Sequence, residues 1–460
     1  MIPRRAWQCM LFTLPLIAGL PALAAPALAG PVRVETLDNG LTVVLKEEHK
    51  APVVSFQVWY KVGSRDEVGG RTGLSHLLEH MMFKGTAAHG KGEYSRIVAK
   101  YGGTENAFTS RDYTAYYMNW APQHLDLSVE LEADRMVNLL VDPEEFNPER
   151  QVVAEERRLR IDDNPVYAAV EQLYAVAYLA HPYRQPTIGW MDDLVRLSRA
   201  DAHAHYKRFY APDNATVVVV GDFAADALLA SIRATMGALP PSGVTRDPVT
   251  AEPEQMGERR ITLEREAQLP FLILGYHVPN WRSPDADALV VLSQLLFEGK
   301  RSRIYERLIY TDQSAVDASG DYDPLATDDP FFYFHAMVAP GHDPAAVEAA
   351  IYEEVARLQT EPPSERELQR AKNQVEADFL FAQDSAYYQA MRLGEAVSVG
   401  AGVDYVDTFP ERIRRVTADD VTRVARAYLL AAHRTVAWMN PTPSPTAQPA
   451  AQPADGEAGS

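Results

Sequence analysis

The sequence predicts an α+β protein built from two similar halves. Its 460 residues are more than one hydrophobic core usually supports, so two domains are expected. Strand patterns and helix patterns occur in both halves. Their order also repeats weakly, because residues 199–217 can be laid on residues 418–436 at an offset of 219, and both segments predict a helix, a short loop and a strand. This repeat indicates internal duplication of one fold.

The elements of the first half follow in order. Alternating apolar residues predict strands at 32–37 and 41–47, joined by the hairpin signal Asp38-Asn39-Gly40. Apolar residues at helical spacing predict a helix within residues 73–83. The remaining patterns predict strands at 53–62, 106–109, 114–120 and 215–220, and helices at 94–101, 124–140, 149–163 and 201–210.

Residues 1–29 have the composition of a secretory signal peptide. A positive start precedes a short apolar run, and small-residue motifs ending at Ala24 or Ala29 are the two candidate cleavage sites. A retained membrane anchor is the alternative, but prolines break the run and it is short for a bilayer span, which favours cleavage. Cys9 is the only cysteine, so the mature protein has no thiol chemistry. We expect export across the inner membrane, to the periplasm in a bacterium, with no stable membrane anchor.

Amino-acid composition predicts where the two lobes end. Residues 238–256 are rich in proline, glycine and acidic residues, as linkers are. Residues 441–460 have almost nothing to bury and predict a disordered tail. The sequence therefore predicts an N-terminal lobe over residues 30–237 and a homologous C-terminal lobe over residues 257–440.

The overall charge limits the class of partner. The formal net charge is −19, with acidic residues spread through the chain. Such a surface repels nucleic acid and anionic membranes. We therefore expect neither as a partner, and we interpret the charge as an aid to solubility.

One stretch of the first half has the residues for metal chemistry. His76 and His80 are four apart and share a helix face, and Glu79 lies beside them. Two imidazoles can hold Zn²⁺, and a neighbouring carboxylate can take a proton from water. The surrounding leucines and methionines predict a mostly buried helix, in which three titratable groups are costly unless a metal compensates them. Surface histidines on an amphipathic helix are the alternative, and the pattern favours zinc.

A catalytic zinc also needs a third protein ligand. A downstream helix, with Pro148 as a plausible first residue, contains Glu149 and Glu156 on one face, whereas Glu155 points about 100° away. A charged, solvated helix is the alternative reading of this segment. Two further histidines, at 203 and 205, diverge on a predicted helix, so we expect them at the surface.

These motifs resemble the inverted zincins of the pitrilysin/insulinase type. The sequence His-x-x-Glu-His is followed by a glutamate 76 residues after its second histidine. Blocks at 102–109, 131–136 and 218–222 extend the similarity to the branch of mitochondrial processing peptidase and its bacterial relatives. The resemblance implies one Zn²⁺ per chain, with ligands His76, His80 and Glu156, the general base Glu79, and a supporting carboxylate, Glu149, outside the ligand set.

The same resemblance implies an architecture and an activity. It implies two similar lobes, each a mainly antiparallel sheet packed with helices, the second without a metal site. Residues Asn106, Ala107 and Phe108 match an edge strand that holds an extended peptide by main-chain bonds. The expected activity is zinc-dependent hydrolysis of peptides or unfolded segments. A non-catalytic scaffold and a peptide-binding subunit of the same fold are the alternatives.

One block departs from the family pattern. Members that act alone have an Arg and a Tyr seven apart in the second half, where they bind the substrate. The aligned positions here are Ile309 and Val316, which cannot donate those hydrogen bonds. Arg307 and Tyr310 are nearby but at the wrong spacing. We therefore expect a heteromer in which a homologous subunit without zinc supplies the Arg/Tyr pair; a displaced clamp in a homodimer is the alternative.

Overall fold

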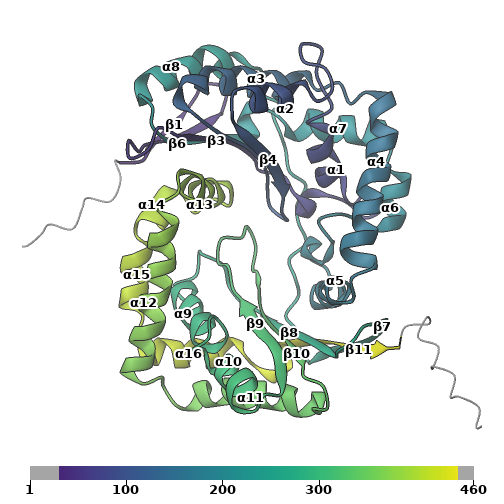
Figure 1. Ribbon diagram of the computed structural model, residues 1–460, viewed down its shortest axis with the longest axis vertical. Helices are drawn as coiled ribbons and strands as arrows, with labels where there is room; N and C mark the ends of the chain where they lie inside the picture. Colours follow the sequence, from purple (N-terminus) through teal and green to yellow (C-terminus); the bar gives the residue numbers. More distant parts are fainter. Residues whose placement is uncertain (1–30, 444–460) are drawn as a thin grey trace, which may run out of the picture.

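The protein forms two lobes, each with one sheet and a set of helices, as a computed structural model of residues 31–443 shows (Figure 1). The α+β class and the two-lobed architecture predicted from the sequence are confirmed. The predicted signal peptide and residues 444–460 of the predicted tail lie outside the described residues. Within residues 31–443, no helix has both the length and the apolar content needed to cross a membrane.

The first sheet has six strands in the order β1-β2-β6-β3-β5-β4. All neighbouring pairs are antiparallel except β2 and β6, which are parallel. Its central strands are almost completely buried, and β4 lies at one edge. The strands are β1 (Arg33–Thr36), β2 (Thr42–Glu47), β3 (Val54–Tyr60), β4 (Thr104–Thr109), β5 (Thr114–Trp120) and β6 (Ala215–Gly221).

The second sheet repeats this order without a counterpart of β1. Its strands are arranged β7-β11-β8-β10-β9, and only β7 and β11 are parallel. Matching N-terminal capping boxes, Ser198 with Asp201 and Thr417 with Asp420, precede the strands β6 and β11. These shared features support the predicted duplication. The strands are β7 (Arg259–Glu266), β8 (Phe271–His277), β9 (Ala315–Asp321), β10 (Phe331–Val338) and β11 (Arg434–Thr442).

The last strand extends into the segment predicted to be the tail. Pro441 and Thr442 still pair with the end of β7, so regular structure continues two residues beyond the expected boundary at 440. Proline is tolerated here because β8, on the other side of β11, pairs only as far as Met439.

Each lobe packs its own helices against one face of its sheet, and each sheet receives one helix from the other half (Figure 1). Helix α13 (Ala386–Ser398) packs on β3 and β6, where Gly394 lies against the ring of Trp59. Helix α5 (Pro165–Ala177) packs on β7, β8 and β11 of the second sheet. The predicted lobe boundaries did not anticipate this exchange.

The helices of the first half are α1 (Leu74–Met81), α2 (Glu93–Lys100), α3 (Leu125–Asn138), α4 (Pro143–Arg157), α5 (Pro165–Ala177), α6 (Met191–Arg196), α7 (Arg199–Phe209) and α8 (Ala225–Thr235). Those of the second half are α9 (Ala286–Leu296), α10 (Arg303–Tyr305), α11 (Pro344–Thr360), α12 (Glu365–Ala382), α13 (Ala386–Ser398), α14 (Val403–Asp407), α15 (Phe409–Arg415) and α16 (Ala418–Tyr428). Two short π-helices, η3 (Arg158–Asp162) and η7 (Glu306–Thr311), follow α4 and α10.

Candidate metal centre

Helix α1 presents its histidines from a buried, firmly anchored position. It starts after Gly73, whose φ of 86° is in the left-handed region that favours glycine. The buried carboxylate of Glu67 accepts the backbone N–H groups of Gly73 and Ser75, each at 2.7 Å, and so caps the helix. Burial nevertheless raises the pKa of Glu67 to about 7. The sequence does not identify this residue as a cap, because it lies outside the usual N-cap position.

The side chains of His76, His80 and Glu156 converge on one point. His76 Nε2 lies 3.8 Å from Glu156 Oε1, and His80 Nε2 lies 3.3 Å from Glu156 Oε2. One ligand atom from each of the three residues lies within 4.8 Å of the others. Within residues 31–443 this is the only group of three His, Cys, Asp or Glu residues arranged in this way. Two imidazole nitrogens and one carboxylate oxygen are a donor set that suits Zn²⁺.

The helix that carries Glu156 starts earlier than the sequence analysis expected. It begins at Pro143, where Asp142 accepts the N–H of Glu144 at 2.7 Å, and Pro148 lies inside the helix. Asp142 followed by Pro143 is a better start signal, because the aspartate caps a free N–H and proline suits the first helical position. The prediction of Pro148 as the first residue was therefore wrong. The helix still brings Glu156 to α1.

Glu149 and Glu155, which precede Glu156 on the same helix, have different surroundings. Glu149 is buried and accepts a hydrogen bond from His80 Nδ1 at 2.9 Å, which leaves Nε2 of the same ring facing Glu156. Glu149 also forms an ion pair with Lys84. Glu155 points away and pairs with Arg158 at the surface. A carboxylate behind a ligating histidine typically fixes the orientation of its ring.

The charges in the cluster favour a cation. Although burial opposes it, bonding to Glu149 and Glu156 raises the pKa of His80 to about 9. Burial, with the neighbouring His80, lowers the pKa of His76 to about 4. The hydrogen bond from His80 lowers the pKa of Glu156. Besides His80, Lys84 pairs with Glu149 and Arg160 pairs with Glu156, so both carboxylates attract positive charge. A divalent cation could replace the proton of His80.

Glu79 lies between this cluster and the edge strand β4. Burial raises its pKa, and its Oε2 accepts a hydrogen bond of 2.5 Å from the hydroxyl of Thr109 on β4. Asn106, Ala107 and Phe108 are on this strand. The N–H of Ala107 donates to Oδ1 of Asn106 at 2.9 Å rather than to β5, so it faces the open edge of the sheet. An extended peptide could pair with this edge.

Comparison with known proteins agrees with this arrangement. Residues 42–190 match the family described as Insulinase (Peptidase family M16), and residues 196–375 match the Peptidase M16 inactive domain. The zinc protease PqqE of Helicobacter pylori is 33% identical over 410 residues, covering 88% of this chain and 92% of that protein. The chain belongs to peptidase family M16.

Further relatives show the same family likeness. The solved structure of a protease from Helicobacter pylori is 32% identical, with a TM-score of 0.85, and covers 90% of this chain and 100% of that one. The mitochondrial-processing peptidase subunit beta of Lentinula edodes is 24% identical over 423 residues, covering 89% of this chain and 90% of that protein. The resemblance seen in the sequence is thereby confirmed.

The block of this M16 chain that departs from the family pattern is not part of the metal centre. Arg307 Nε donates to Asp312 at 2.5 Å, and its other nitrogens face glutamates of α11. Tyr310 is 78% exposed. Ile309 packs against the second hydrophobic core, and Val316 is half exposed on β9. None of these four side chains is among those that line the cavity beside His76.

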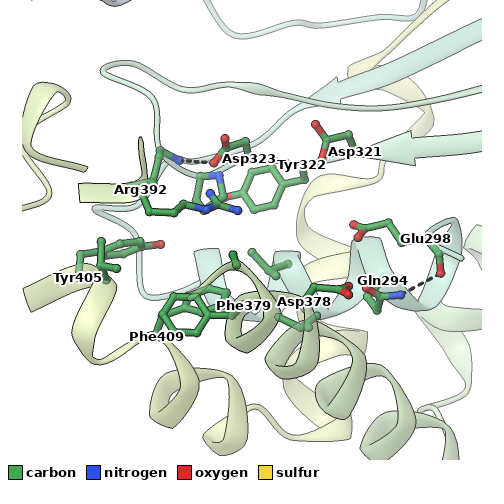
Figure 2. Close-up of a pocket in the computed structure, with 16 residues that line it drawn as sticks. Gln294, Glu298, Asp321, Tyr322, Asp323, Asp378, Phe379, Arg392, Tyr405 and Phe409 are labelled. Carbon is green, nitrogen blue, oxygen red and sulfur yellow. Dashed lines mark hydrogen bonds between the residues drawn. The ribbon is translucent and has the colours of Figure 1, made fainter. Parts of the chain in front are cut away.

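A cavity of about 370 Å³ lies beside α9, the helix that follows β8 as α1 follows β3 (Figure 2). Its labelled side chains include Glu298, Asp321, Asp323, Asp378 and Arg392 (Figure 2). Carboxylates are present here, but no histidine lines the cavity.

One expectation about the first half was wrong. His205 is buried, not at the surface: it is only 7% exposed, and its Nε2 lies 3.1 Å from the hydroxyl of Ser75 on α1. Burial lowers its pKa to about 3, so the ring is neutral. His205 shares a face of α7 with Ala202 and Phe209, which are also buried. That apolar spacing was the signal that could have placed it in the core.

Proposed function

We propose that this chain is a zinc-dependent endopeptidase that hydrolyses peptides or unfolded segments. The observation that carries the proposal is the convergence of His76, His80 and Glu156 beside Glu79, on a buried helix next to an open strand edge. The three converging residues would hold one Zn²⁺. When bound there, the ion would supply Lewis acidity and a water of lowered pKa. The names of relatives as zinc proteases support this assignment.

Glu79 would act as the general base. Its carboxylate would accept a proton from the attacking water and pass it to the nitrogen of the leaving amine. A raised pKa suits this task, because a base works best when its pKa approaches the operating pH. The hydroxyl of Thr109 would hold the carboxylate in place.

The edge strand β4 would position the substrate. A peptide added beside Asn106, Ala107 and Phe108 would accept the N–H of Ala107 in place of the Asn106 side chain. Pairing of this kind recognises the main chain of an extended segment. Compact proteins could not present such a segment, so short or unfolded peptides are the proposed substrates.

Zinc content and peptide cleavage together test the proposal. The purified mature chain should contain one zinc by atomic emission and should cleave a mixed peptide library, however slowly. His76→Ala combined with His80→Ala should remove both the metal and the activity. Near-stoichiometric zinc in this double variant would exclude the site.

A heteromeric assembly is the second part of the proposal. The relative from Lentinula edodes is by name one subunit of a peptidase. The positions aligned with the expected Arg/Tyr pair hold Ile309 and Val316, whose side chains cannot donate hydrogen bonds. We propose that a homologous subunit without zinc supplies that pair. A scaffold or peptide-binding role without turnover would be indicated by zinc binding without cleavage in any subunit combination.

We also propose that the chain is exported and works in the periplasm of a bacterial host. The signal-like composition of residues 1–29 supports this. N-terminal sequencing of the protein from a periplasmic fraction should find a start directly after Ala24 or Ala29. Recovery of the chain with its first residues intact would contradict cleavage.

A further inference from the structure

A cavity of about 280 Å³ opens directly beside the candidate metal centre. His76 and Thr109 line one side of it, and α5 lines the other with Tyr174. Two arginines, Arg111 and Arg184, complete its wall from the segment after β4 and from the loop after α5. Glu171 and Arg160 also line the cavity, but each is held in an ion pair, with Arg157 and Glu156 respectively. The cavity therefore combines a route to the reacting site with the positive charges of half-buried Arg111 and exposed Arg184.

Neither arginine has an acidic partner. The guanidinium of Arg111 lies 4.0 Å from the centre of the Tyr174 ring, and its Nε donates to the backbone oxygen of Tyr183 at 3.3 Å. Arg184 Nη1 donates to the backbone oxygen of Leu179 at 2.9 Å. Among residues 31–443, no carboxylate oxygen lies within 4.0 Å of either side chain.

Other arginines, such as Arg150 and Arg199, also bond only to backbone oxygens, but Arg111 and Arg184 do so beside the candidate metal centre. The sequence has 63 acidic and 44 basic residues, so acids are in excess. Neighbouring arginines are paired: Arg157 with Glu171 at 2.7 Å, and Arg160, which also lines the cavity, with Glu156 at 2.7 Å. Arg111 is half buried against aromatic rings, where an uncompensated charge is costly. A carboxylate from a ligand would compensate it.

We propose that Arg111 and Arg184 bind a carboxylate of the peptide substrate next to the scissile bond. The inference rests on the proposed peptidase function. A guanidinium presents a planar fork of N–H donors that matches a carboxylate, which makes arginine well suited to this recognition. A peptide paired with β4 and passing Glu79 would place a neighbouring residue in this cavity. The site would then select an acidic side chain, or a free C-terminus, over neutral and basic groups.

Matched peptides test the selection. Peptides of one sequence, with Glu, Gln or Lys at each position near the cleavage point, are compared by kcat/KM. We expect Glu to exceed Gln about ten- to hundred-fold at one position, as charged hydrogen bonds do. Comparing kcat/KM for peptides with free and amidated C-termini shows whether the bound carboxylate is an acidic side chain or the C-terminus. Equal kcat/KM for acid and amide forms at every position and at the terminus would overturn the inference.

Variants assign the effect to the arginines. Arg111→Gln and Arg184→Gln should each reduce the ratio of kcat/KM for the Glu peptide to kcat/KM for the Gln peptide. Arg184→Glu should shift the preference towards Lys, a gain that misfolding cannot produce. Arg158→Gln is the matched control, because this exposed arginine is on η3 outside the cavity. A preference unchanged in Arg184→Gln and Arg184→Glu would also contradict the proposal.

A binding measurement separates this inference from the proposed function. Fluorescent Glu and Gln peptides are titrated into the Glu79→Gln variant, and their dissociation constants are compared by anisotropy. The site is supported if the Glu peptide binds more tightly than the Gln peptide to the Glu79→Gln variant, and if adding Arg184→Gln removes this difference. This holds even if no peptide is ever cleaved. If peptides are cleaved but Glu and Gln peptides show equal dissociation constants and equal kcat/KM, the carboxylate site is rejected and the peptidase proposal is unaffected.

Discussion

Half-buried Glu79 and buried Glu149 are carboxylates beside the same histidine pair, but their surroundings differ. Burial acts to raise the pKa of Glu149, but His80 and Lys84 outweigh it and hold the pKa below its usual value, so Glu149 stays ionised. Glu79 has only a hydroxyl donor, and burial holds its pKa above the usual range. The raised pKa makes Glu79 the better proton acceptor of the two, whereas Glu149 accepts a hydrogen bond from His80 Nδ1, as carboxylates behind ligating histidines do.

Replacing Glu79 by glutamine should separate catalysis from metal binding. The amide has nearly the same shape but cannot accept the proton. We expect kcat/KM to fall by about 10²–10⁴-fold, as is typical when a proton-transfer group is lost, while zinc content by atomic emission is unchanged. Activity within a few-fold of the wild type would remove Glu79 from the role of base.

Glu156 and Glu155 provide a paired test of the third ligand. They are adjacent in sequence, but Glu156 faces His76 and His80, whereas the side chain of Glu155 is 64% exposed. Glu156→Gln should weaken zinc affinity by at least the roughly 10–100-fold that follows loss of a supporting group, measured by competition with a chelator. Glu155→Gln should leave it nearly unchanged, and the opposite result would mean that Glu155 is the ligand.

Local spacing explains why these residues could be predicted from the sequence. Separations of four and seven residues place side chains on one helix face whatever the tertiary fold, so spacing paired His76 with His80 and Glu149 with Glu156. The choice of Glu156 as the third ligand came from the family resemblance. Glu67 and His205 were not, because their roles come from the packing of α1 against a loop and against α7. Whether an arginine has a carboxylate partner likewise depends on tertiary contacts. The sequence therefore could not show that Arg111 and Arg184 lack one.

At the scale of elements, most strands and helices of the first half lie within a few residues of their predicted positions. Hairpin signals and alternation are local, so the β1–β2 pair was predictable. The exchange of α5 and α13 was not, because an apolar helix face does not specify which sheet it covers. In addition, no helix was predicted from the sequence at residues 165–177 or 386–398, so α5 and α13 are known only from the fold.

The contact of α13 with the first sheet leads to a prediction about Gly394. A Cβ at this position would lie 2.1 Å from the indole of Trp59. Trp59 has little freedom to move, because its Nε1 donates to Gln57 at 3.0 Å and its ring packs edge-on against Phe108 and Tyr113. In an unobstructed helix, alanine would be favoured over glycine by about 0.8–1.0 kcal/mol.

Overpacking should outweigh that preference. We expect Gly394→Ala to lower the free energy of unfolding by about 1–3 kcal/mol, measured by denaturant titration of the mature chain. Gly257→Ala is the control, since a Cβ there has no atom within 4 Å. A stability of Gly394→Ala equal to or above that of the wild type would show that α13 does not pack on Trp59.

At the scale of the whole molecule, the candidate zinc ligands of the first half converge on one point. The Arg/Tyr pair expected in the second half to bind the substrate is absent from the aligned positions. Ile309 is packed in a core, and Arg307 is bound by Asp312 on the side of α11. An enzyme that positions its peptide poorly loses much of the rate advantage of holding reactants in place. We therefore expect the isolated mature chain to be a weak peptidase.

A homologous subunit should restore full activity. It should lack His-x-x-Glu-His but have an Arg and a Tyr seven residues apart, and it should co-purify with this chain from the native host, where mass spectrometry would identify it. Turnover of a peptide library is compared for the chain alone and for the complex, with oligomeric state measured by light scattering. Glu79→Gln in the complex is the control, because it should abolish the restored activity if this chain supplies the chemistry. Rapid zinc-dependent turnover by a pure homodimer would exclude the partner, although the metal centre would still account for catalysis.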